Sequence, residues 1–161
     1  MIMSKKSGFL FLVIAVFLSF PGNALRASEK PQEAMDRVRT FSIKILEKSL
    51  QSENAFIRSA AARAAGESEY SGLIPFLKKA AKDSYHTTRL FALQGIKKIS
   101  LDEARSISIH MSRDPNIWVR GAAIEMLGEL GDGALGNIIQ PHLKSPDRTV
   151  RYAAAGALFK L

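Results

Sequence analysis

The stretch "DPNIWVRGAAIEMLGELGD", residues 114–132, decides the fold, because its pattern recurs along the chain at a constant interval. It combines a helix-start signal, Asp114 and Pro115, with Arg120, a pair of alanines and an apolar helix that ends in glycine. Four arginines, Arg58, Arg89, Arg120 and Arg151, follow one another at intervals of 31 residues. The stretch is therefore one copy of a repeated unit, and its residues need an architectural explanation before a functional one.

The columns around the four arginines predict four helices. Each arginine is preceded, six residues earlier, by a residue of N-cap type: Ser52, Asp83, Asp114 or Ser145. Their side-chain oxygens can accept a hydrogen bond from an unpaired backbone N–H, so we predict that they cap the helices, with Pro115 and Pro146 in the first helical position. Apolar residues one before and three, seven and ten after the arginines form one buried helical stripe.

A second, weaker set of apolar residues lies between these helices in the same phase and predicts a partner helix for each. The chain is thus predicted to be all-α, an α-solenoid of four helix pairs with a 31-residue period. The copies are predicted at about 32–66, 71–98, 102–129 and 133–161. Pro141 falls inside the last partner helix and should kink or shorten it, because proline removes an internal hydrogen bond.

The segments "DPNIWVRGAAIEMLGELGD" and "SPDRTVRYAAAGAL" resemble HEAT-type repeats, in particular the short HEAT-like variety named after phycobilisome lyases. The resemblance covers residues 32–161 and implies a right-handed superhelical stack whose arginine-bearing helices line a curved inner face. It also implies a ladder of aspartates and arginines between repeats, with Asp83 and Arg89, and Asp114 and Arg120, as members. Ser52 and Ser145 interrupt this ladder, so Arg58 and Arg151 are expected to find other acceptors, such as neighbouring carbonyls.

Residues 1–27 are predicted to be a signal peptide that is cleaved after Ala24 or Ala27, leaving a repeat domain at 28–161. Lys5 and Lys6 precede the uncharged run "GFLFLVIAVFLSF", and small residues follow it. The run is too short to cross a bilayer comfortably, which disfavours the alternative of an uncleaved anchor helix. We therefore expect an exported protein, periplasmic or secreted.

No catalytic residue, metal site or cofactor is predicted. The chain contains no cysteine, which excludes thiolate ligands, cysteine nucleophiles and disulfides. Its three histidines, His86, His110 and His142, occupy different repeat positions and form no closely spaced metal-binding pair. The net charge is +8, but the arginines of the repeat are explained by architecture, and an exported protein meets little nucleic acid. Nucleic-acid binding is therefore not expected.

Function is predicted to reside on the inner face of the arginine-bearing helices, at positions one, four, five and eight after each arginine. Several residues there are apolar, which is typical of a partner surface. The alternative is that they pack against adjacent helices. The residues expected to contact a protein or peptide partner are Arg63, Leu90, Leu93, Gln94, Lys97, Ile124, Glu125, Tyr152 and Phe159. The chain is accordingly predicted to be a non-catalytic protein-binding or scaffolding module.

Three other possibilities remain open. The family resemblance permits a lyase or lyase-assisting role. The basic residues Arg37, Arg39, Lys44 and Lys48 permit binding to an anionic membrane or envelope polymer. Finally, the last helix ends on apolar residues, so Leu158 and Leu161 are expected to lack a neighbour on one side. A homo-oligomer or a partner protein that covers the C-terminal helix is therefore possible.

Overall fold

The computed structural model describes residues 30–161, and the predicted signal peptide lies outside the described residues. The chain divides into two compact units, residues 1–41 and 42–161. Helix α2, Pro31–Leu50, runs across the boundary and contains no buried residue. In the second unit, Ile43, Leu46 and Leu50 at its C-terminal end are partly buried against the apolar core.

The second unit consists of short helices, and no strand occurs in residues 30–161. After the end of α2 come α3 (Ala55–Glu67), η2 (Ser71–Leu73), α4 (Ile74–Ala80), α5 (His86–Ile99), α6 (Leu101–Met111), α7 (Ile117–Glu129), η3 (Gly133–Leu135), α8 (Gly136–Ile139), η4 (Gln140–Lys144) and α9 (Arg148–Lys160). This order confirms the prediction of an all-α repeat fold.

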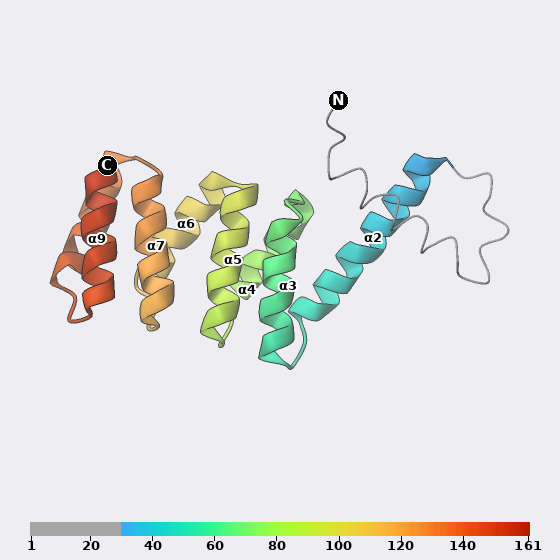
Figure 1. Cartoon of the computed structure of the whole chain (residues 1–161), viewed down its shortest axis with the longest axis horizontal. Coiled ribbons are helices and arrows are strands. Elements are labelled where there is room, and N and C mark those ends of the chain that lie inside the picture. Colours follow the sequence, from blue (N-terminus) through green and yellow to red (C-terminus); the bar gives the residue numbers. More distant parts are fainter. Residues whose placement is uncertain (1–29) are drawn as a thin grey trace, which may run out of the picture. The chain divides into compact units, whose positions relative to one another are not determined.

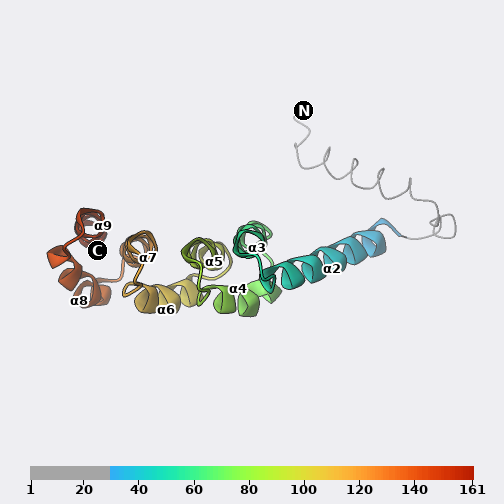
Figure 2. The ribbon, with the colours of Figure 1, turned by 90° about the horizontal axis from the view of Figure 1, so that it is seen from below.

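The helices of the second unit form two layers. Helices α3, α5, α7 and α9, called here the arginine helices, stand side by side in one layer (Figure 1). Helices α4, α6 and α8 form the other layer, as the view turned by 90° shows (Figure 2). The core lies between the layers, where fully buried Leu77, Ile96, Leu127 and Ile139 remove apolar surface from water.

Pro141 shortens the last partner helix, as predicted. Helix α8 ends at Ile139, and residues 140–144 continue as a 3-10 helix with the proline in its first turn. The missing N–H of Pro141 cannot complete an α-helical hydrogen bond, so the tighter helix takes over at this point.

The predicted N-caps were wrong by two residues. The caps that bond to the first turn are Asn54, Asn116 and Asp147, and α5 begins after Tyr85 without a side-chain cap. Ser52, Asp83, Asp114 and Ser145 instead accept the backbone N–H two residues further on, at 3.2, 2.8, 2.8 and 3.3 Å. Each builds a turn that leads into its helix. Pro115 and Pro146 therefore lie in these turns and not in the first helical position.

Small residues set the spacing of the arginine helices. A Cβ atom on Gly66 of α3 would lie 2.3 Å from the Cα of Gly95 in α5, and one on Gly128 of α7 would lie 2.4 Å from the Cα of Ala157 in α9. Between α5 and α7 the equivalent positions hold Lys97 and Met126, whose side chains prevent such an approach. The copies therefore form two tightly packed pairs, α3 with α5 and α7 with α9, joined at a seam with larger side chains.

Candidate functional site

A ladder of arginines and aspartates runs along the N-terminal ends of the arginine helices. Arg58 donates from Nε and Nη2 to the two carboxylate oxygens of Asp83, at 2.6 and 2.8 Å. Arg89 holds Asp114 in the same way, at 2.7 and 2.6 Å. Both pairs are largely buried and bidentate, which is the strongest geometry for this kind of ion pair. The ladder thus fixes each copy to the next.

The aspartate of each pair comes from the copy after the arginine. Arg58 therefore has an acidic partner, contrary to the prediction, whereas Arg120 faces the copy that begins with Ser145 and has no carboxylate within salt-bridge distance in residues 30–161. All four arginines also donate from Nη1 to the carbonyl six residues earlier, at 2.6–2.8 Å. These carbonyls are the acceptors expected for Arg151, which bonds to Ser145 and Pro146.

The Arg58–Asp83 pair makes stability depend on pH. The hydrogen bond from Arg58 holds the pKa of Asp83 below its ordinary value against the opposing effect of burial, and the Tyr85 N–H and the charges of Arg58 and Arg89 also lower it. A depressed carboxyl pKa stabilises the fold above the unfolded pKa, about 3.9, and this contribution is lost as pH falls through the folded pKa. The window of loss therefore lies below about pH 4.

We expect Asp83→Asn to lower the midpoint of urea denaturation at pH 7, because it leaves Arg58 without its charge partner. As pH falls below about 4 and through the lowered folded-state pKa of Asp83, the difference from the wild-type chain should shrink, since Asp83 then loses its charge in the folded state too. Glu53→Gln, which changes an exposed acid in the same turn as Ser52, is the control. A difference between Asp83→Asn and wild type that does not shrink at any pH below about 4 at which the chain is still folded would contradict this account.

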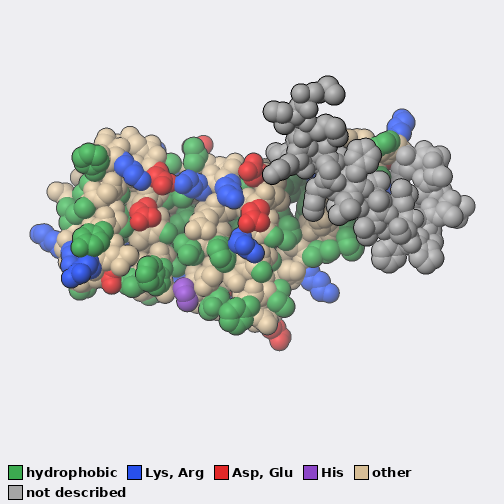
Figure 3. All heavy atoms as spheres, in the orientation of Figure 1, with side chains coloured by type: hydrophobic (Ala, Val, Ile, Leu, Met, Phe, Trp, Pro, Cys, Tyr) green, Lys and Arg blue, Asp and Glu red, His purple; other side chains and the backbone are tan. Residues whose placement is uncertain are grey.

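The arginine helices expose only a narrow face to solvent. The face consists of the residues two positions before and two, five and nine positions after each arginine. The other sides of a helix in the stack are covered by the neighbouring arginine helices and by the second layer. The mostly exposed members of this face are Phe56, Ala60, Arg63, Glu67, Gln94, Lys98, Trp118, Glu125, Glu129, Thr149, Gly156 and Lys160. Charged side chains of both signs lie on it among hydrophobic ones (Figure 3).

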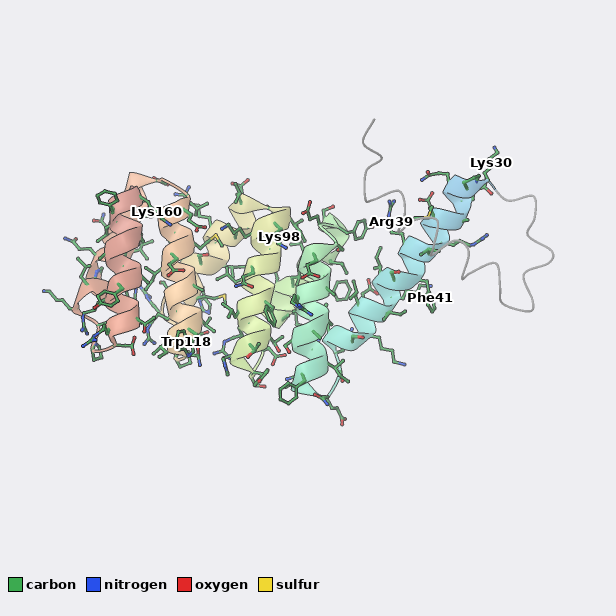
Figure 4. The ribbon with its side chains drawn as sticks, viewed as in Figure 1. Lys30, Arg39, Phe41, Lys98, Trp118 and Lys160 are labelled. Atoms are coloured by element: carbon green, nitrogen blue, oxygen red, sulfur yellow. The ribbon has the colours of Figure 1, made fainter. Side chains whose placement is uncertain are left out.

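This exposed face is aromatic at one edge and charged at the other. Phe56 and Trp118, 71% and 59% exposed, lie in the first turns of α3 and α7. Lys98 and Lys160 lie at the opposite ends of their helices from Trp118 (Figure 4). Lys97, in turn, forms a salt bridge with Glu129 across the seam between α5 and α7. The face therefore offers apolar anchors beside a row of hydrogen-bonding groups.

The structure corrects part of the predicted contact set. Leu93 and Ile124 are fully buried in the core and cannot contact a partner. Leu90 is partly buried, and Lys97 is partly buried and paired with Glu129. Arg63, Gln94 and Glu125 are exposed on the face described above. The error has a geometric cause: positions one, four and eight after the arginine point at the next arginine helix, not at solvent, as the Gly66 and Gly128 contacts show.

Tyr152 and Phe159 are exposed, at 68% and 94%, but they lie on a different side of α9. Their columns, one and eight after the arginine, correspond to Gly121 and Gly128 of α7, which face α9. Leu158 and Leu161, which were expected to lack a neighbour on one side, are partly buried against the cluster that contains Leu135 and Ile139. The exposed apolar surface of α9 is thus carried by the two aromatic rings.

Within residues 30–161 no group of three or more His, Asp or Glu side chains is placed to hold a metal ion. An open pocket of about 580 Å³ between the end of α2 and the start of α3 is lined by Lys44, Glu47, Lys48, Ser49, Gln51, Ser52 and Ile57. Its charged groups belong to one exposed stretch of helix and form no ordered acid–base pair.

His142 lies near the ladder arginine Arg120. Burial, and then the positive charges of Arg120 and Arg113, lower the pKa of its imidazole, so the ring is mostly neutral at pH 7. His86 instead lies against the ring of Tyr85, with 5.1 Å between the ring centroids, and Tyr85 makes an edge contact with Phe56 at 5.7 Å. This aromatic cluster extends the apolar edge of the exposed face from α3 to α5.

Residues 104–161, which include α7 and α9 with their ladder arginines, match the family model of HEAT repeats. This match supports a HEAT-like repeat protein. HEAT repeats commonly mediate contacts between proteins, and the layered arrangement of the second unit agrees with this family. No curated protein shows a significant match to the sequence.

The predicted contact set left out the aromatic edge. Phe56 and Trp118 lie two residues before their arginines, in a column that Thr87 and Thr149 complete, and this column was not assigned to the face. A signal for the correct rotation was present: the columns five and nine after the arginine hold Arg63, Glu125, Glu67, Lys98, Glu129 and Lys160, the most polar positions of these helices. Charged columns mark the solvent side of a helix.

Proposed function

We propose that this HEAT-like protein is a non-catalytic binding module whose exposed face, as defined above, receives a segment of a partner protein. The observation that carries the proposal is the exposure of Phe56 and Trp118 on the folded surface of the arginine helices. Large aromatic side chains exposed on a folded surface are typical anchors of protein interfaces, because they bury much apolar area and lose little conformational entropy.

The proposed mode of binding is contact across several helices. Apolar groups of the partner would cover Phe56, the Tyr85 ring and Trp118 at the N-terminal edge. Its polar groups would meet Arg63, Gln94 and Glu125 along the middle of the face. Because the ladder and the Gly66 and Gly128 contacts hold neighbouring helices in fixed register, these groups are already placed before the partner arrives.

The test uses the fact that Trp118 is the only tryptophan in the chain. A photoreactive amino acid at position 118 should capture the partner in intact cells, and the same amino acid at Leu101 should not. Leu101 is equally exposed, at 58%, but lies on α6 in the other layer. With the captured partner purified, binding should shift Trp118 emission to shorter wavelength, and Phe56→Ala should weaken binding about tenfold.

Two results would refute the proposal. One is equal capture from positions 118 and 101. The other is binding of the purified partner with unchanged Trp118 emission and unchanged affinity in Phe56→Ala, since the partner would then occupy another surface. Leu101→Ala provides the matched control for loss of an exposed apolar side chain.

The module is further proposed to work outside the cytoplasm, on the strength of the uncharged run at residues 8–20 and the small residues that follow it. N-terminal sequencing of the protein recovered from a periplasmic or culture-medium fraction should begin after Ala24 or Ala27. Recovery of a chain that begins at Met1 in the cytoplasmic fraction would contradict this.

A second candidate function, binding to an anionic membrane, is supported by α2. This helix buries no residue and exposes Phe41 and Ile45 beside Lys44 and Lys48. Within residues 30–161, no helix is both long and apolar enough to cross a bilayer. We propose that α2 would bind at the membrane surface through these basic and apolar side chains, so co-sedimentation with vesicles that contain anionic lipid should fall as salt is raised. Salt-independent or absent co-sedimentation would remove this candidate.

A further inference from the structure

The third rung of the ladder differs from the first two. Arg58 and Arg89 each use three nitrogens: Nη1 bonds to backbone carbonyls, and Nε with Nη2 grips the aspartate of the next copy. Arg120 is anchored identically by Nη1, at 2.6 Å from the carbonyl oxygen of Asp114. In residues 30–161, however, its Nε and Nη2 have no hydrogen-bond acceptor. The edge of the guanidinium that binds a carboxylate in two copies is therefore presented without one in the third.

The residue that begins the next copy explains the difference. Ser145 stands where Asp83 and Asp114 stand, and its shorter side chain accepts the backbone N–H of Asp147 at 3.3 Å. In the first two rungs the equivalent N–H groups, of Tyr85 and Asn116, donate to the ladder carboxylate at 2.8 Å. The acid nearest in sequence, Asp147, is occupied as the N-cap of α9, where it accepts the N–H of Val150. No carboxylate of the described chain supplies the missing group.

The surroundings of Arg120 favour an anion. Arg113 and Arg120 both act electrostatically on His142, so two positive charges and a neutral imidazole share this region. Arg120, Ser145 and His142 are half-buried, which leaves the guanidinium open to solvent while it reduces the screening of its charge. A planar guanidinium edge matches a carboxylate in bidentate geometry better than it matches a spherical ion.

We propose that the Nε and Nη2 edge of Arg120 binds a carboxylate group supplied by another molecule, in the place that Asp83 and Asp114 occupy on the first two arginines. The Asp147 N–H would be a further donor to the bound group, as the Tyr85 and Asn116 N–H groups are to theirs. This site is separate from the exposed aromatic face and does not depend on the protein-binding role proposed above. Its ligand is defined by chemistry, as the carboxylate of a small acid or of an Asp or Glu side chain.

The test is a titration of the full chain with sodium acetate at constant ionic strength, followed by ¹H–¹⁵N spectra. The Arg120 Nε–H and the Asp147 backbone N–H should shift saturably. The Nε–H signals of Arg58 and Arg89 should stay in place, because their aspartates already hold them. A capped peptide with one aspartate, compared with the same peptide carrying asparagine, distinguishes a side-chain carboxylate from a small acid. A response to acetate alone assigns the site to small acids. Tighter binding of the aspartate peptide assigns it to protein partners.

The matched variants are Ser145→Asp and Ser145→Ala. Ser145→Asp should supply the carboxylate within the chain, abolish the acetate response and raise Tm by about 3 °C. Ser145→Ala should retain the response, since the hydroxyl is not part of the bound group. Arg120→Lys keeps the charge but lacks the planar edge, and should weaken the acetate-dependent shift of the Asp147 N–H about fivefold or more.

Three results would overturn the proposal: no saturable shift with acetate in the wild-type chain, an equal acetate response in Ser145→Asp, or an unchanged affinity in Arg120→Lys. Inorganic phosphate at the same ionic strength is the last probe. Weaker binding than acetate is expected, and tighter binding would overturn the assignment of a carboxylate as the ligand. Because none of these measurements uses Trp118 or a protein partner, failure here would leave the proposed protein-binding role to its own test.

Discussion

Ile124→Glu is expected to destabilise the fold by about 4 kcal/mol or more, a large share of the total stability of an ordinary domain. Ile124 is fully buried in the apolar cluster between α7 and α9, with Leu127 and Ile139. A glutamate there would either carry an unpaired charge into the core or bind a proton at a cost in free energy. Circular dichroism during urea denaturation measures the loss.

The next residue is the control. Glu125 is exposed on the same turn of α7, so Glu125→Ala should change the free energy of unfolding by about 0.5 kcal/mol or less. Leu93→Glu, in α5, should behave like Ile124→Glu because Leu93 is also fully buried. A folded Ile124→Glu chain with near wild-type stability would show that α7 is rotated relative to the structure described here. Loss of partner binding in either core variant would report unfolding and not a lost contact.

The repeat and its helices could be predicted from the sequence, because they depend on local spacing. The 31-residue interval of Arg58, Arg89, Arg120 and Arg151 reflects a unit that buries one stripe of each helix against its neighbours. Pro141 acted as expected, since its effect on a helix requires only its own ring and missing N–H. Local properties of this kind can be predicted without knowing how neighbouring copies contact each other.

The ladder and the exposed face could not be predicted in full, because both depend on contacts between copies. The spacing of Asp83 and Arg89 within one copy gives no indication that Asp83 bonds to Arg58 of the copy before. Likewise, Leu93 and Ile124 lie on a side of their helices that would be exposed in a single helix pair. Only the neighbouring arginine helix of the next copy covers that side. A helix in the middle of a stack is covered on three sides. Its single exposed side is therefore narrower than the exposed side that a helical wheel of one helix predicts.

The caps show a local ambiguity of a different kind. Asp114 and Asn116 are both N-cap residue types, separated by two positions, and either could begin α7. The Asp114 carboxylate binds Arg89, and one of its oxygens also accepts the Asn116 N–H. Asn116 is then left to cap Trp118 and Val119. The Ser52 and Ser145 hydroxyls accept the N–H two residues further on in the same way, although neither hydroxyl bonds to an arginine side chain of the described residues, so the turn itself, and not the ion pair alone, sets the helix start.

Gly128→Ala is expected to destabilise the fold by about 2–3 kcal/mol, although alanine is normally the better helix former. The added Cβ would lie 2.4 Å from the Cα and 2.8 Å from the carbonyl oxygen of Ala157, so the backbones of α7 and α9 must separate. Gly66→Ala should act similarly, through the Cα of Gly95. Separation would also disturb the arginine edge next to Ser145, because α7 carries Arg120 and α9 follows Ser145.

The matched control is Gly156→Ala, on α9 itself. A Cβ at Gly156 meets nothing within 4 Å, so this change should stabilise the chain by about 0.5–1 kcal/mol through helix propensity alone. Thermal and urea denaturation should therefore show a loss of stability in Gly128→Ala and Gly66→Ala and a gain in Gly156→Ala, although the chemical change is the same. Equal stabilisation by Gly128→Ala and Gly156→Ala would mean that α7 and α9 are not in backbone contact. The pairing of copies into two tight units would then have no physical basis, because it rests on the small residues at these crossings.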